Sequence, residues 1–351
     1  MTDVQPRWKP EALPGFEPPT LSTDDALAET AEIMERAIAE HKPSRRFLLF
    51  SGGNDSLVVL DALAPLADEI VHVNTGIGIT ETNAFARRVA GAYDLPFTEM
   101  HPPKPYEWHV LREPFINGKG TFSRGWDGLP GPGAHRYTYI NLKQRAIEEL
   151  LRRHRRFSGE RFMLLAGVRK AESRRRMGTA QEVWRDGGQV WVNPLLNWSN
   201  ESMREYRQGE SLPINEVSVH LHMSGECLCG AMADQGPEEE ERAQIRFFYP
   251  DFDRRLCALE KACRDAGKTY TRWGVKRRPD GRWKREEWCG VCGPEDLTDS
   301  DEHQDGGGSI DHDYAATYGP WVWVPTSDDA GPMCASCEFR GQQSLDLDGA
   351  S

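Results

Sequence analysis

The sequence predicts an α/β fold with a doubly wound, mostly parallel sheet of five strands, and three observations support this. Short apolar runs typical of buried strands alternate with longer segments of helical periodicity. A Ser-Gly-Gly turn joins the first such run to an apolar helix. Gly-containing turns follow later strands as well, and in doubly wound sheets ligands bind at the carboxyl ends of the strands.

The expected elements follow one another in the order strand, helix, strand. Each expected strand is short and rich in β-branched, aromatic or aliphatic residues. Ser22 and Thr23 are expected to cap the first helix, which precedes the first strand. The strands are predicted at 47–50, 70–74, 97–100, 163–166 and 190–192. The helices are predicted at about 24–41, from near 55, from 81 to about 93, around 142, at 201–206 and at 252–267.

The turn after the first strand has the features of a phosphate-binding loop. Its glycines let the backbone turn sharply and bring N–H groups close to an anion. The helix that begins near Asp55 directs the positive end of its dipole to the same place. The loop lacks the lysine of a Walker loop and the third glycine of a dinucleotide fingerprint. Its residues are Ser51, Gly52, Gly53, Asn54, Asp55 and Ser56.

This loop resembles the PP-loop of the adenine-nucleotide alpha-hydrolase superfamily, which includes the ATP pyrophosphatases and the phosphoadenylylsulfate (PAPS) reductase family. Further segments, in matching order over about 45–232, are similar to the PAPS reductase family. They are Asn74-Thr75-Gly76 with Glu81-Thr82, a Leu142-Lys143 pair that follows Arg136-Tyr137, the run from Gly167 to Arg176, and Pro194 to Trp198.

The resemblance implies a set of nucleotide-binding and catalytic residues. Gly167 permits close backbone approach, and Arg169 can hold a phosphate or sulfate with two parallel hydrogen bonds. Mg²⁺ is expected near Asp55. The expected catalytic residues are Asp55, Arg169 and Lys143. The expected nucleotide-binding residues are the six loop residues with Asn74, Thr75, Gly76, Gly167, Arg169 and Arg176.

Three functions remain open at this point. In the first, ATP adenylates a substrate, pyrophosphate leaves, and the product accepts sulfur, as in enzymes that thiolate tRNA or DNA. In the second, a thiol reduces PAPS or APS to sulfite. The PAPS reductase family carries that thiol on a C-terminal tail, but no cysteine follows Cys337 here, which favours the first function. The third is a non-catalytic protein that senses a nucleotide.

The eight cysteines indicate a metal site more strongly than disulfides. Two Cys-x-x-Cys pairs, Cys289 with Cys292 and Cys334 with Cys337, have the spacing of zinc or iron–sulfur ligands. Zn²⁺ would need only these four thiolates. A [4Fe–4S] cluster could instead combine one pair with Cys227 and Cys229.

The chain divides into three expected parts, with different composition. Residues 1–21 form a loose, proline-rich lead, 22–232 the nucleotide-binding domain, and 233–351 a helical and Cys-rich extension with an acidic linker. The segment 270–288 interleaves basic and aromatic residues, which suits either a nucleic-acid acceptor or a solvated hairpin.

The amino-acid composition limits which binding partners are expected. With 43 basic and 55 acidic residues, the net charge of −12 argues against coating nucleic acid by bulk charge. The sequence shows neither a signal peptide nor a membrane span, so a cytoplasmic protein is expected. A sulfur donor protein is an expected partner, and the oligomeric state stays open.

Overall fold

The computed structural model describes residues 21–116, 122–123, 125–132, 134–172, 180–233 and 240–275. Most of the N-terminal lead, Arg176 and the four cysteines of the Cys-x-x-Cys pairs lie outside these residues. The strands are β1 (Arg45–Leu49), β2 (Glu69–Val73), β3 (Phe97–Met100), β4 (Phe115–Ile116), β5 (Phe122–Ser123), β6 (Phe162–Leu165), β7 (Val183–Asp186) and β8 (Gln189–Val192).

The helices match the predicted intervals and add several that were not predicted. The α-helices are α1 (Thr23–His41), α2 (Asn54–Leu63), α3 (Thr80–Ala90), α4 (Tyr106–Leu111), α5 (His135–Tyr139), α6 (Arg145–His154), α8 (Asn200–Gly209), α9 (Glu216–Leu221), α10 (Glu240–Phe248) and α11 (Pro250–Asp265). Two 3₁₀ turns, η1 (Ala64–Leu66) and η3 (Lys170–Glu172), and a π-helical segment, η2 (Ile140–Gln144), complete the described elements. The first helix is capped as expected, because the Ser22 hydroxyl accepts a hydrogen bond from Asp25 N at 3.2 Å.

The main sheet has six strands in the order β3-β2-β1-β6-β8-β7. All five predicted strands are present and run parallel to one another. The predicted count of five was one short, because β7 adds an antiparallel edge strand that turns back from β8. Three of its four residues are exposed, so it lacks the apolar run that identified the other strands.

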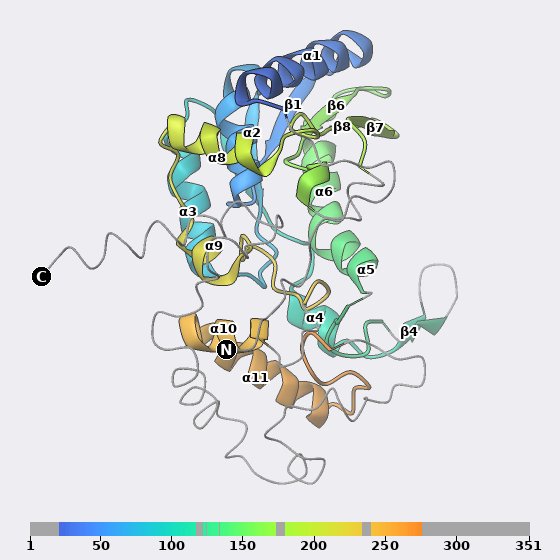
Figure 1. Cartoon of the computed structure of the whole chain (residues 1–351). Coiled ribbons are helices and arrows are strands. Elements are labelled where there is room, and N and C mark those ends of the chain that lie inside the picture. The colour runs from blue at the N-terminus through green and yellow to red at the C-terminus, as the bar shows by residue number, and fades with distance from the viewer. Residues whose placement is uncertain are drawn as a thin grey trace, which may run out of the picture.

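Two layers of helices cover the sheet (Figure 1). Helices α1, α2, α3 and α8 pack on one face through a core that includes Leu48, Ile70 and Trp198. Helix α6 packs on the other face against Phe47, Val71 and neighbouring residues. Alternate residues of a strand thus enter opposite cores, as the two-residue period of a strand requires. Trp198 is fully buried in this core.

A second core lies beyond the carboxyl ends of the strands, where Figure 1 shows α4, α10 and α11 below the sheet. It contains side chains from both sides of residue 232, the boundary expected between the two domains. Ile77 and Ile79 from the loop after β2 pack there with Leu256 of α11. No described helix has the length and apolar character needed to cross a bilayer.

Candidate functional site

The loop after β1 is compact and ends at the first turn of α2. Gly52 has a φ of +79°, which favours glycine. The Ser56 hydroxyl accepts a hydrogen bond from Ser51 N at 3.2 Å and donates to Gly53 O at 2.9 Å. These two hydrogen bonds hold the loop against the N-terminus of α2. The positive end of the helix dipole lies there, and it favours binding of an anion.

Three segments that are remote in sequence support the loop. A Cβ added at Gly52 would lie 3.0 Å from the Thr82 methyl group, and one at Gly53 would lie 3.1 Å from Ser224 Cβ. The amide of Asn215 donates to Gly52 O at 2.9 Å. A side chain at either position would therefore press against a neighbour, and at Gly52 the positive φ favours glycine as well.

Gly167 and Arg169 follow β6, the strand beside β1. The chain runs from β1 to β2 on one side and reaches β6 on the other, so a topological switch point lies between these strands. A Cβ at Gly167 would lie 2.8 Å from the carbonyl carbon of Asp55 and from Ser56 N. The α2 helix therefore begins directly against the backbone at Gly167.

The Arg169 side chain is 1% exposed and lies against the loop. Its Nε lies 3.2 Å from Asp55 Oδ1, and its Nη1 donates to Trp198 O and to Asn200 Oδ1, both at 3.2 Å. The structure thus brings two expected catalytic residues together as an ion pair between a buried guanidinium and a partly exposed carboxylate. Contact between Arg169 and a phosphate stays a prediction.

The turn after β2 lies at the same carboxyl edge of the sheet as the loop. Thr75 is fully buried, and its hydroxyl donates to Glu226 O at 2.9 Å. The Asn74 amide donates to Glu99 Oε1 at 2.7 Å, and Asn74 Oδ1 accepts from Gly76 N at 3.0 Å. The Arg87 guanidinium, with help from this amide, lowers the pKa of Glu99 to about 2 although burial opposes the shift.

Lys143 forms an ion pair in this region that the sequence did not predict. It belongs to the π-helical segment η2, and its Nζ lies 2.5 Å from Glu226 Oε2. Burial opposes protonation of Lys143, but the Glu226 carboxylate together with Cys227 and Cys229 outweighs burial and raises the pKa of the amine. Glu226 is 3% exposed, and its Oε1 has no hydrogen-bond partner among the described residues.

Cys227 and Cys229 follow Glu226, and each shifts the pKa of the other. Cys229 is buried and Cys227 is partly exposed. Cys227 lowers the pKa of Cys229 to about 7 although burial opposes this, whereas the pKa of Cys227 is raised. Within the described ranges, no group of three or more His, Cys, Asp or Glu residues could hold a metal ion.

The structure gathers most expected site residues at the carboxyl edge of the sheet. The loop, Thr75, Gly167, Arg169 and Lys143 are connected there by the contacts above. Sequence reasoning missed the supporting residues Asn215, Ser224 and Glu226, which lie far from the loop in sequence. The one available signal in the sequence was that Asn215 precedes a short amphipathic stretch, because asparagine is a preferred helix cap. In the structure, the Asn215 side chain accepts a hydrogen bond from Val217 N at the start of α9.

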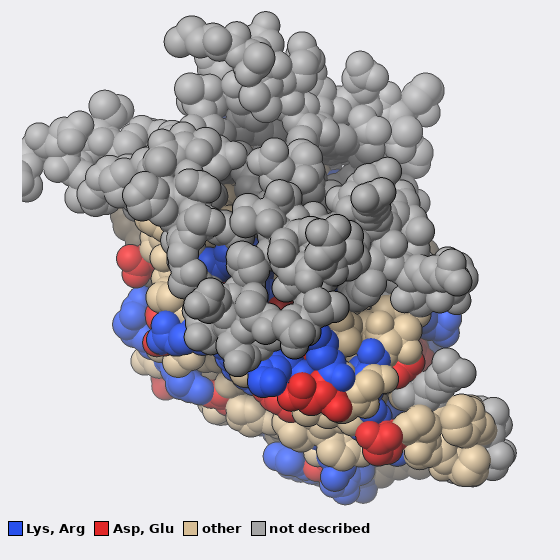
Figure 2. Space-filling view, turned by 90° about the horizontal axis from the view of Figure 1, so that it is seen from below, with Lys and Arg blue, Asp and Glu red and all other residues tan. Residues whose placement is uncertain are grey.

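The expected nucleic-acid segment is described only up to Val275. Trp273 within it is 6% exposed and packs in the second core, so its ring does not face a base. Figure 2 views the molecule from the α10–α11 side, where Lys and Arg side chains lie among Asp and Glu. Arg255 of α11 forms an ion pair with Glu107 of α4, and Lys261 forms one with Asp265 within α11. Nucleic-acid contact stays a prediction.

Comparison with known proteins identifies the protein family that the chain matches. Residues 45–222, about half of the chain, match the family model described as the phosphoadenosine phosphosulfate reductase domain. Sulfate adenylyltransferase subunit 2 of Streptomyces lavendulae is 28% identical over 224 residues. That match covers 57% of this chain and 64% of the relative, so the chain spans less than two thirds of that protein.

Two solved structures share weaker similarity. Phosphoadenylyl-sulfate reductase from Candida auris, in a phosphate complex, is 17% identical with a TM-score of 0.38, and the match covers 57% of this chain and 93% of that one. FMN adenylyltransferase from Candida glabrata, with FMN and an ATP analogue, is 14% identical with a TM-score of 0.37, covering 57% and 61%. On the family match over the whole sheet, the chain belongs to the phosphoadenosine phosphosulfate reductase domain family.

Proposed function

We propose that the chain binds ATP at the loop after β1 and adenylates a substrate, releasing pyrophosphate, in a reaction of sulfur metabolism. One observation carries the proposal: the loop closes onto the start of α2 while Asp55, on its first turn, is fixed by the buried Arg169. A helix N-terminus attracts phosphates, and a fixed carboxylate beside it suits the metal ion that accompanies them.

The residues have distinct roles in this proposal. Loop N–H groups hold the phosphates while a substrate oxygen attacks the α-phosphorus, forming an O–P bond as the bond to pyrophosphate breaks. Mg²⁺ usually binds one or two carboxylates and the substrate phosphates, and the single carboxylate of Asp55 fits this pattern. Bound Mg²⁺ would neutralise charge on the leaving pyrophosphate. Lys143 provides a fixed positive charge at the same edge.

The family and one relative support adenylation. The family model covers the loop, β6 and the segment up to α9. The Streptomyces lavendulae relative is named as a subunit of an adenylyltransferase for sulfate, which makes sulfate the first acceptor to test. That name also suggests a partner subunit, so the test should include the chain alone and in cell extract.

The experiment measures pyrophosphate release by the full chain with ATP and Mg²⁺, first with sulfate and then with other oxygen acceptors. We expect acceptor-dependent release that Asp55→Asn lowers at least 100-fold, and that Asp94→Asn, a change of an exposed aspartate, leaves unchanged. A parallel arm supplies PAPS and a dithiol reductant and measures sulfite.

Each outcome discriminates between functions. Sulfite from PAPS, without pyrophosphate from ATP in any arm, would replace adenylation by sulfonucleotide reduction. Tight ATP binding with neither product in extract or alone would favour a nucleotide sensor. Acceptor-dependent pyrophosphate release that survives Asp55→Asn would remove the role given to the ion pair with Arg169.

A further inference from the structure

Asn215 is buried beside the loop after β1 and contacts its backbone directly. The side chain is 2% exposed, and its Nδ2 donates to Gly52 O at 2.9 Å and to Ser224 O at 3.2 Å. Its Oδ1 accepts from Val217 N at 3.1 Å. A backbone carbonyl only accepts and a backbone N–H only donates, so these partners determine which way the amide faces. The NH₂ group therefore faces the loop, and the oxygen caps α9.

The contact with Gly52 O determines where the next N–H group of the loop points. No peptide bond among the described residues is cis, and in a trans peptide the C=O and N–H groups point in opposite directions. Because Asn215 holds Gly52 O, the Gly53 N–H faces away from Asn215. There it donates to Ser51 Oγ at 3.4 Å, a long hydrogen bond that a phosphate oxygen can replace with a shorter, charge-assisted one.

The same peptide leads into the first turn of α2. Gly53 is the N-cap of this helix and has no side chain that could cap it. A backbone hydrogen bond from Leu57 N to Gly53 O, at 3.0 Å, closes the first turn, so the N–H groups before Leu57 have no acceptor within the helix. Fixing the peptide between Gly52 and Gly53 therefore fixes the direction of the N–H groups that attract phosphates.

Protein atoms fill the space on the Asn215 side of the loop. A Cβ added at Gly52 would lie 3.0 Å from the Thr82 methyl group and 3.7 Å from Asn215 Nδ2. The Thr82 hydroxyl lies 3.3 Å from Asn215 Nδ2 and donates to Ser224 O at 2.5 Å. A ligand therefore has to approach the loop from the other side, toward which the Gly53 N–H points.

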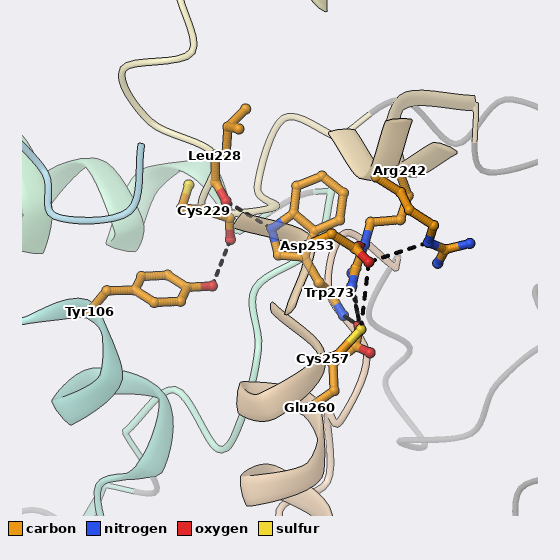
Figure 3. A network of polar contacts seen from close by, with 9 residues as sticks. Tyr106, Leu228, Cys229, Arg242, Asp253, Cys257, Glu260 and Trp273 are labelled. Atoms are coloured by element: carbon orange, nitrogen blue, oxygen red, sulfur yellow. Dashed lines mark hydrogen bonds and ion pairs between the residues drawn. The ribbon is translucent and has the colours of Figure 1, made fainter. Parts of the chain in front are cut away.

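The segment that contains Ser224 is anchored in the second core. Beyond Ser224, Trp273 Nε1 donates to Leu228 O at 2.8 Å, and the Tyr106 hydroxyl donates to Cys229 O at 3.0 Å (Figure 3). Both the indole and the phenol belong to buried side chains of that core. The asparagine amide thus joins the loop to a support that is itself held in place.

We propose that Asn215 is a positioning residue for the phosphates of ATP. By holding Gly52 O, it directs the Gly53 N–H and the start of α2 at the side of the loop where the phosphates bind. Asn215 acts through the loop, because its own side chain lies on the side that protein atoms fill. This role rests on phosphate binding, the first step of the function proposed above, and does not require that pyrophosphate is released.

The test measures binding of tripolyphosphate, ATP and adenosine to the full chain by titration calorimetry. Asn215→Ser keeps a neutral oxygen that can cap α9 but removes the amide donors to Gly52 O. We expect tripolyphosphate and ATP to bind about tenfold more weakly, and adenosine to bind within about twofold of wild type. Asn193→Ser is the matched control and should leave all three affinities unchanged. Asn193 is 4% exposed, and its amide donates at 2.7 Å to Gln181 O, a backbone carbonyl outside the loop.

A second variant separates positioning from helix capping. Asn215→Asp retains a good helix cap, but its carboxylate repels Gly52 O, so tripolyphosphate should again bind at least tenfold more weakly. Circular dichroism verifies that the variants are folded.

The outcomes distinguish this role from the others. If Asn215 only caps α9, both variants keep the wild-type phosphate affinity, which would overturn the proposal. Equal losses for adenosine and tripolyphosphate would overturn it too, as would a loss confined to Asn215→Asp, which charge repulsion alone explains. A wild-type chain that binds neither tripolyphosphate nor ATP would also overturn it. Phosphate binding that depends on Asn215, without pyrophosphate release, would support this role and count against adenylation.

Discussion

Arg169 and Asp55 form the contact that joins two neighbouring strands beneath the nucleotide loop. The arginine follows β6, the aspartate lies in the first turn of α2, and Arg169 Nε lies 3.2 Å from Asp55 Oδ1. Because Arg169 also donates to Trp198 O and Asn200 Oδ1, the segment before α8 is tied to the same guanidinium. One buried cation thus positions three parts of the candidate site.

Replacing this cation should affect both stability and nucleotide binding. Arg169→Met leaves Asp55 without its partner and should cost about 3 kcal/mol in the free energy of unfolding. Lys170→Met removes a neighbouring cation that donates to Asn197 at 2.7 Å, and should cost about 1 kcal/mol. Urea unfolding and ATP calorimetry measure both effects. Equal losses in the two variants would show that the contact with Asp55 has no special weight.

The close contact at Gly167 gives a steric prediction. Gly167→Ala places a methyl group 2.8 Å from the backbone of Asp55 and Ser56, so the start of α2 must move. We expect at least tenfold weaker ATP binding, measured by calorimetry. Gly209→Ala is the control, because nothing lies within 4 Å of its added Cβ at the end of α8. Wild-type affinity in Gly167→Ala would contradict the packing of the loop.

A double-mutant cycle tests the pair of Lys143 and Glu226. Lys143→Met leaves a buried carboxylate unpaired and should cost about 3 kcal/mol in stability. Glu226→Gln removes that charge, so the double variant should be more stable than the sum of the single changes by about 2 kcal/mol. Chemical denaturation of the four proteins gives this coupling energy. Additive changes would mean that the two side chains do not interact in solution.

His109 predicts a pH dependence of stability. Burial, with the nearby Arg145 and Arg112, lowers the pKa of His109 to about 4. The unfolded chain then binds a proton that the folded chain does not, so this stability is complete above about pH 6.5 and is lost as pH falls toward 4. The loss is at most about 3 kcal/mol.

Comparing variants isolates this contribution to the pH dependence. His109→Gln should flatten the fall in unfolding free energy between pH 6.5 and 4, whatever it costs through the lost stacking on Trp126. His101→Asn, at an exposed histidine, should leave the slope unchanged. Equal slopes in the wild-type protein and His109→Gln would refute the assignment.

The Cys-x-x-Cys pairs predict a bound metal. The full chain, purified without oxygen, should carry either zinc or an iron–sulfur cluster with visible absorbance, because paired thiolates at this spacing bind such ions. Changing Cys289 and Cys292 to serine should remove it, whereas Cys263→Ala should not. A folded and metal-free wild-type protein, judged by elemental analysis and circular dichroism, would exclude the site.

Local patterns were sufficient to predict the main sheet. The central strands β2 and β6 are buried on both faces, so each appears in the sequence as an apolar run that is easily recognised. The edge strand β7 was missed because its residues face solvent. In the site, the loop was recognisable because its glycines and serines are contiguous, whereas the residues that support it come from distant segments.

The sequence by itself determined the parallel sheet, the position of the anion-binding loop and its family resemblance, because these depend on contiguous residues. Only the tertiary structure decided that Arg169 is buried against Asp55 and that Glu226 pairs with Lys143. These contacts join segments that are tens of residues apart or more in the sequence. Such relationships arise from packing and buried charge, which no local periodicity records.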